Sequence, residues 1–78
     1  MSRIDIPSAV AGTVWQIIAE PGAPVGAGDI LMILESMKLE IEVPAPQAGR
    51  LRLAVTEGQV VSVGDIVATL DPSDSDPV

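Results

Sequence analysis

The centre of the chain reads Ile33-Leu34-Glu35-Ser36-Met37-Lys38-Leu39-Glu40-Ile41-Glu42-Val43. After Lys38, apolar residues alternate with glutamates, which is the pattern of a β-strand with one solvated face. The apolar run that ends at Leu34 has the length of a second strand. Only a residue or two remains between the two runs, so we predict a tight hairpin with Met37 and Lys38 at its tip. A two-residue turn prefers Asn-Gly or Asp-Gly, and the poor turn sequence Met-Lys therefore points to a function at the tip.

An internal repeat extends outward on both sides of this hairpin. The segment PSAVAGTV, residues 7–14, aligns with PAPQAGRL, residues 44–51, and the order of glycines continues beyond it. Gly22 aligns with Gly58, and the step Gly28-Asp29 aligns with Gly64-Asp65. Two units are too few for a solenoid, so the repeat predicts one fold with approximate two-fold internal symmetry. Lys38, the one lysine of the chain, lies where the halves meet.

Short strands separated by glycine and proline account for most of the chain. We expect them at residues 14–18, 30–34, 39–43, 51–55, 60–63 and 66–70, which predicts an all-β barrel or sandwich. The alternation of the 51–55 segment, carried to its repeat partner, places Val14, Gln16 and Ile18 on one face and Trp15 and Ile17 on the other. Trp15 is then interpreted as a packed sheet residue. Four of the aligned glycines are interpreted as turn positions, since no Gly-Lys-Ser/Thr ending of a phosphate loop follows them: Gly22, Gly28, Gly58 and Gly64.

The composition excludes several classes of function. The chain has 78 residues, enough for one domain, with no Cys, no His and a net charge of −7. Without Cys or His we expect no metal site and no catalytic residues, so the chain is not predicted to be an enzyme by itself. The negative charge argues against nucleic-acid and anionic membrane partners. We expect no signal region and no membrane-spanning segment, and the absence of Cys, and so of disulfides, suits a cytoplasmic setting. We expect a folded domain over residues 1–71 and a disordered acidic tail over residues 72–78.

The hexapeptide Glu35-Ser36-Met37-Lys38-Leu39-Glu40 resembles the biotin attachment motif of biotinyl domains. The similarity extends from about Ile4 to Asp71 and includes the glycine pattern. It is greatest to free-standing biotin/lipoyl attachment proteins and to the biotin carboxyl carrier subunits of acyl-CoA carboxylases. The resemblance implies a flattened barrel, or barrel-sandwich hybrid, of two four-stranded sheets with the modified lysine on the hairpin that joins the halves.

The resemblance also implies a function and a set of partners. Lys38 would accept biotin from a biotin protein ligase, and the tethered biotin would shuttle a carboxyl group between a biotin carboxylase and a carboxyltransferase. Met37 occupies the flanking position that aids partner recognition in the family, and Leu39 stands where methionine is commoner. Glu35 and Glu40 match acidic positions that help ligase docking or lysine placement.

Three alternatives remain open from the sequence. A lipoyl carrier, or a carrier of both cofactors, is one, although that family usually shows Asp-Lys-Ala at the site. An unmodified hammerhead adaptor module is another, although its usual coiled-coil context is absent from this sequence. The third is the plain structural interpretation, in which Lys38 is only a solubilising charge. Arg50 and Arg52 are interpreted separately, as a solvated strand face.

Overall fold

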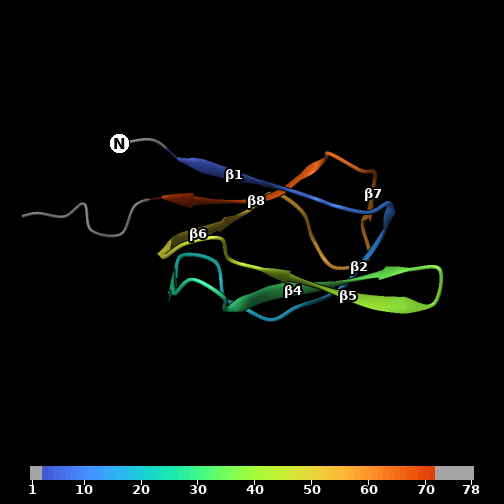
Figure 1. Ribbon diagram of the computed structural model, residues 1–78, viewed down its shortest axis with the longest axis horizontal. Coiled ribbons are helices and arrows are strands. Elements are labelled where there is room, and N and C mark those ends of the chain that lie inside the picture. Colours follow the sequence, from blue (N-terminus) through green and yellow to red (C-terminus); the bar gives the residue numbers. More distant parts are fainter. Residues whose placement is uncertain (1–2, 72–78) are drawn as a thin grey trace, which may run out of the picture.

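The computed structural model describes residues 3–71, which form short β-strands joined by turns (Figure 1). Their bounds are β1 (Ile4–Pro7), β2 (Gly12–Ile17), β3 (Pro24–Val25), β4 (Ile30–Ser36), β5 (Leu39–Pro44), β6 (Gly49–Leu53), β7 (Val60–Val61) and β8 (Ile66–Asp71). These described residues contain no helix that is long and apolar enough to cross a membrane. The predicted tail over residues 72–78 lies outside the described residues.

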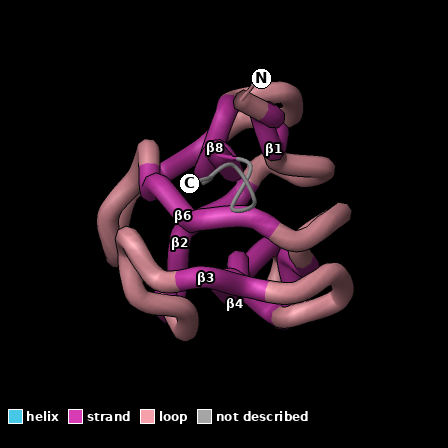
Figure 2. The backbone as a smooth tube through the Cα atoms, turned by 90° about the vertical axis from the view of Figure 1, so that its left-hand side faces the viewer, coloured by secondary structure: helices cyan, strands magenta, loops and turns pink. Residues whose placement is uncertain are grey.

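The strands form two antiparallel sheets that lie face to face (Figures 1 and 2). The strand order is β1-β8-β6-β3 in one sheet and β5-β4-β2-β7 in the other. The repeat partner of each strand lies four strands further along the chain, counting on from β8 to β1. Replacing every strand by its partner converts one order into the other. The predicted two-fold symmetry and the all-β fold of two four-stranded sheets are therefore confirmed. Each sheet takes two strands from each half, so the halves are interleaved rather than side by side.

The core fills the space between the sheets because one face of each strand is apolar. Val14 and Leu34 face inward from one sheet, and Leu51 and Leu70 face inward from the other; all four are buried. Each pair is matched by symmetry, since Val14 corresponds to Leu51 and Leu34 to Leu70 in the repeat. Residues that align in the sequence repeat therefore occupy equivalent positions in the core.

The repeated Gly-Asp steps form equivalent turns. Gly28 and Gly64 have φ values of 91° and 90°, a left-handed conformation that glycine adopts without steric cost. The Asp29 carboxylate accepts a hydrogen bond from the Gly26 amide at 2.8 Å. The Asp65 carboxylate accepts the matching bond from the Ser62 amide, also at 2.8 Å. The interpretation of these glycines as turn positions is confirmed.

Strand β2 departs from the predicted alternation. Its register against β4 shifts between Val14 and Gln16, which marks a β-bulge at Trp15. The extra residue turns Ile17 toward the core, whereas Gln16 and Ile18 are exposed. The predicted two-face pattern is therefore wrong beyond Val14. Trp15 is half exposed, at 50%, rather than packed inside.

Candidate functional site

The central hairpin has the tight turn that the sequence predicts. Strands β4 and β5 pair as far as Ser36 and Leu39, leaving Met37 and Lys38 as a two-residue turn. The hairpin protrudes at one end of the molecule, opposite the end where β1 begins (Figure 1). Met37 and Lys38 have φ values of 52° and 68°, and within residues 3–71 they are the only non-glycine residues with positive φ. Positive φ at both central residues is the requirement of a type I′ turn.

The base of the hairpin is fixed by the loop and strand beside it. The Ser36 hydroxyl donates a hydrogen bond of 2.8 Å to the Ala11 carbonyl oxygen. Gly12 lies so close to β4 that a Cβ there would overlap the Glu35 carbonyl oxygen. Neither contact was predicted from the sequence, although the pairing of Gly12 with Gly49 in the repeat was visible. Together they join the base of the hairpin to β2 and to the loop before it.

Lys38 is exposed, and its neighbours at the tip are exposed as well. Met37 is 91% exposed and Leu39 is 63% exposed, unusual values for large apolar side chains. The ion pairs within residues 3–71 are formed by Arg3, Arg52 and Asp71, so Lys38 takes part in none of them. Its amine is therefore open to an incoming enzyme and fits the role of an attachment point for an acyl group.

Two glutamates face each other just behind the turn. Glu35 and Glu40 are register partners across β4 and β5, and both are exposed. Like charges directly opposite each other on a sheet are destabilising. The structure thus brings together all five residues that the sequence singled out: Glu35, Met37, Lys38, Leu39 and Glu40. Their individual roles remain predictions.

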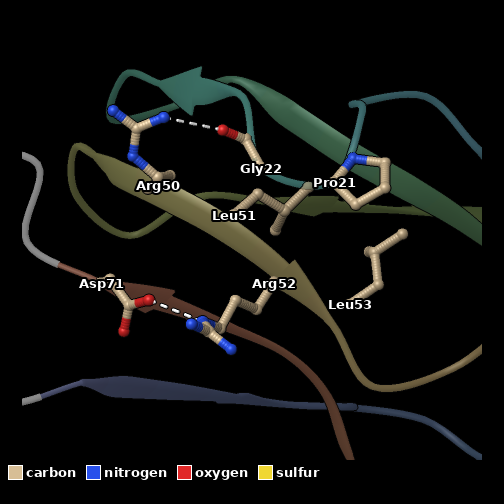
Figure 3. A pocket seen from close by; sticks show the side chains of 7 residues that line it. All are labelled: Pro21, Gly22, Arg50, Leu51, Arg52, Leu53 and Asp71. Carbon is tan, nitrogen blue, oxygen red and sulfur yellow. Dashed lines mark hydrogen bonds and ion pairs between the residues drawn. The ribbon is translucent and has the colours of Figure 1, made fainter.

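A shallow hollow lies at the end of the molecule away from Lys38, on the outside of β6 (Figure 3). The Arg50 guanidinium donates to the Gly22 carbonyl oxygen at 2.9 Å. Arg52 and Arg3 pair with Asp71 at 2.7 and 3.1 Å. The hydrogen bond from Arg52 is the largest of the causes that hold the pKa of Asp71 below its ordinary value of 3.8. Arg50 and Arg52 are exposed as predicted, but each has an intramolecular partner.

Comparison with known proteins gives consistent matches. Residues 3–70 match the family model described as "Biotin-requiring enzyme". The biotinylated protein TB7.3 homolog of Mycobacterium leprae is 36% identical over 85% of this chain and 94% of its own length. The biotin/lipoyl attachment protein of Bacillus subtilis is 34% identical over 82% of this chain and 89% of its own length. The Kluyveromyces lactis urea carboxylase structure matches 90% of this chain with a TM-score of 0.84 and 32% identity, but the match is 6% of that enzyme.

These matches agree with the sequence on two points. The relatives that the chain spans almost completely are named as biotinylated or attachment proteins, which supports a carrier rather than a catalytic domain. The family description confirms biotin as the cofactor that the motif predicts. Because the family model covers residues 3–70 and both of these relatives exceed 30% identity, the chain belongs to the biotin-requiring enzyme family, as a biotin/lipoyl attachment domain.

Proposed function

We propose that this chain is a biotin carboxyl carrier, in which Lys38 bears the biotin and carries a carboxyl group between a biotin carboxylase and a carboxyltransferase. The observation that carries the proposal is the position of the single lysine. It stands at the tip of a two-residue turn with a φ of 68°, exposed and outside the ion pairs of residues 3–71.

Attachment requires the Lys38 amine to attack an activated biotin carboxyl group in the active site of a biotin protein ligase. The new bond is an amide, the activating group leaves, and the Lys38 ammonium group gives up two protons, one before the attack and one as the amide forms. The positive charge of Lys38 disappears in this step, which changes the net charge of the chain from −7 to −8, since one of its four cationic groups is removed. The chain has no His to accept the proton, so we assign that task to the ligase.

Once attached, biotin would supply a ureido nitrogen that carries the carboxyl group. The hairpin holds the arm away from the body of the domain, and tethering replaces the diffusion of a free cofactor with a high local concentration. The exposed Met37 and Leu39 side chains give the partner enzymes apolar contacts beside the arm. Glu35 and Glu40 give a negative surface that a basic partner surface recognises. The chemistry itself belongs to the cofactor and the partner enzymes.

Intact-mass analysis after co-expression with a biotin protein ligase tests the attachment. We expect one biotinyl increment on the wild-type chain and none on Lys38→Arg, which keeps the charge but removes the acylable amine. An Arg52→Lys variant serves as the matched control, because it adds a second exposed amine outside the hairpin. It should still receive a single increment, at Lys38. A second increment on the Arg52→Lys variant, or an unmodified wild-type chain, would contradict the proposal.

A second candidate function, a lipoyl carrier, is favoured by the similarity to the biotin/lipoyl attachment protein of Bacillus subtilis. The same mass measurement separates the two, because co-expression with a lipoyl ligase would then give a lipoyl or octanoyl increment on Lys38.

For the biotinylated protein, the shuttling role is tested with a purified biotin carboxylase. We expect bicarbonate-dependent ATP cleavage that requires the biotinylated chain and is absent with Lys38→Arg.

A further inference from the structure

The outer face of the β5-β4-β2-β7 sheet carries apolar side chains that the rest of residues 3–71 leaves partly or largely exposed. The register places Val60 beside Thr13, Thr13 beside Glu35, and Glu35 beside Glu40. The next row joins Gln16 to Ile33 and Glu42, with Trp15 at the bulge between the rows. We call this surface the outer face; it consists of Trp15, Ile33, Val60, Glu35, Glu40 and Glu42.

The apolar part of the outer face is unusually open. Val60 is 73% exposed and Trp15 is 50% exposed, and neither is one of the buried residues that form the core. Trp15 is also the only aromatic residue of the chain, which has no Tyr and no Phe. Partly exposed tryptophans with apolar neighbours are typical of protein interaction sites, where they contribute much of the binding energy.

The internal symmetry allows the charges on the outer face to be compared with those at the matching positions of the other sheet. In the other sheet, Glu35, Glu40 and Trp15 correspond by repeat position to Asp71, Arg3 and Arg52. There the chain neutralises itself, because Asp71 pairs with Arg52 at 2.7 Å and with Arg3 at 3.1 Å. On the outer face the same positions hold two opposed glutamates and an indole. No ion pair of residues 3–71 involves those glutamates.

At these matched positions the chain thus supplies cations for the carboxylate of Asp71, but it supplies none for Glu35 and Glu40. We propose that the outer face docks the biotin carboxylase that acts on the Lys38 cofactor, through an enzyme surface with arginine or lysine side chains around an apolar cleft for Trp15. The docking rests on the proposed carrier function. Charge complementarity sets the orientation of the two proteins as they meet. The Trp15 indole supplies affinity because docking buries it.

The distance of Trp15 from the lysine favours a carboxylase over the ligase. Ile33, which shares the row beside Trp15, precedes Lys38 by five residues, or about 16 Å along an extended strand. A ligase must bring its reacting carboxyl group to the Lys38 amine itself, at the tip. An enzyme that acts at the far end of the cofactor arm works at a distance from the tip and can rest on the flank of the hairpin.

Steady-state kinetics with a purified biotin carboxylase, ATP and bicarbonate test the docking, with the biotinylated chain as the varied substrate. We expect Trp15→Ala to raise KM about tenfold or more with little change in kcat, and Trp15→Phe to recover part of the loss. Val60→Ser should raise KM several-fold. Val63→Ser is its matched control, because Val63 is 67% exposed but lies in the turn after β7, outside the outer face. Its KM should equal that of the wild type.

Salt dependence tests the electrostatic part. The wild-type KM should rise with ionic strength, and Glu42→Gln should both raise KM at low salt and weaken that dependence. Circular dichroism and thermal midpoints of the variants confirm that they are folded.

Other outcomes overturn the docking. A biotinylated wild-type chain with the same KM as Trp15→Ala and Val60→Ser would overturn it while leaving the carrier function intact. Slower biotinylation of the variants with unchanged carboxylation would assign the outer face to the ligase instead. A concentration-dependent dimer that Trp15→Ala abolishes would assign it to a second copy of the chain. Absence of biotin on wild-type Lys38 would overturn the carrier function, and the docking with it.

Discussion

Met37 and Lys38 adopt backbone angles that L-residues with long side chains usually avoid. A left-handed conformation costs such a residue about 1–2 kcal/mol relative to glycine. The tight pairing of β4 with β5 imposes this conformation, because no other residues are left to turn the chain. The hairpin therefore holds the sequence Met37-Lys38 in a turn that a different sequence would form more stably.

Replacing the tip with the preferred turn sequence tests this interpretation. We expect the double variant Met37→Asn, Lys38→Gly to increase the free energy of unfolding by about 1–2 kcal/mol, or at least about 4 °C in thermal midpoint for a domain of this size. The variant should also lose all biotinylation, since it has no lysine. Lys38→Arg, the control, should lose biotin without gaining stability. A double variant no more stable than the wild type would contradict strain at the tip.

Asp71 gives a prediction about pH. Its pKa is lowered in the folded chain, chiefly by the Arg52 hydrogen bond, so its contribution to stability is fully present above its ordinary pKa of 3.8 and disappears as pH falls through the lower native pKa. Asp71→Asn should therefore be less stable than the wild type at neutral pH, and the difference should shrink below about pH 4. Thermal midpoints from pH 2 to pH 7 measure it. Arg52→Gln should reduce the same pH dependence, and a constant difference across the range would refute the assignment.

At the scale of the elements, local patterns predicted the strands that alternate and missed the features that depend on a neighbouring strand. The alternation of Leu39 to Val43 predicted β5 correctly, and the repeat located the turns at Gly28 and Gly64. Strand β3 was not predicted, because a two-residue strand containing Pro24 has no periodicity to detect. The bulge at Trp15 was missed because it arises from the register of β2 against β4.

The same reasoning explains what the sequence revealed of the site. The hairpin and Lys38 follow from contiguous residues, so they were visible in the motif. The outer face collects Trp15, Glu42 and Val60 from three strands, and its composition depends on sheet order. No segment of the sequence contains it.

The close approach of β2 to β4 predicts a ranking of glycine substitutions. At Gly12 a Cβ would overlap the Glu35 carbonyl oxygen, whereas at Gly22 nothing lies within 4 Å and only the φ of 84° opposes a side chain. We expect Gly12→Ala to cost about 3 kcal/mol or more, since two backbones must separate, and Gly22→Ala about 1–2 kcal/mol. Urea denaturation of the two variants measures the ranking. Gly49→Ala should resemble Gly12→Ala, because its Cβ would lie 2.7 Å from the Asp71 carbonyl oxygen. The reverse ranking would contradict the close approach.

At the scale of the whole molecule, the interleaving of the halves determines how the chain folds. Within residues 3–37 only β2 and β4 pair with each other, and within residues 38–71 only β6 and β8 do. The pairs β1·β8, β3·β6, β4·β5 and β2·β7 all join one half to the other. The core is divided in the same way, since Val14 and Leu34 pack against Leu51 and Leu70 from the other half. A two-stranded sheet with an open apolar face is marginally stable in water, so neither half should fold alone.

Cutting the chain between Met37 and Lys38 tests this dependence. We expect the fragments 1–37 and 38–78 each to give the circular dichroism spectrum of an unfolded chain, and an equimolar mixture to recover the strand spectrum, because only the mixture restores the four pairings between the halves. In the intact chain, Trp15 fluorescence and far-ultraviolet circular dichroism should report one common unfolding midpoint, since a single core serves both sheets. Cooperative melting of fragment 1–37 by itself would mean that the halves are separate folding units. The symmetry would then be a property of the sequence without consequence for folding. Interleaving predicts the opposite. The hairpin that carries Lys38 pairs β4 of one half with β5 of the other, so it should form only when both halves fold together.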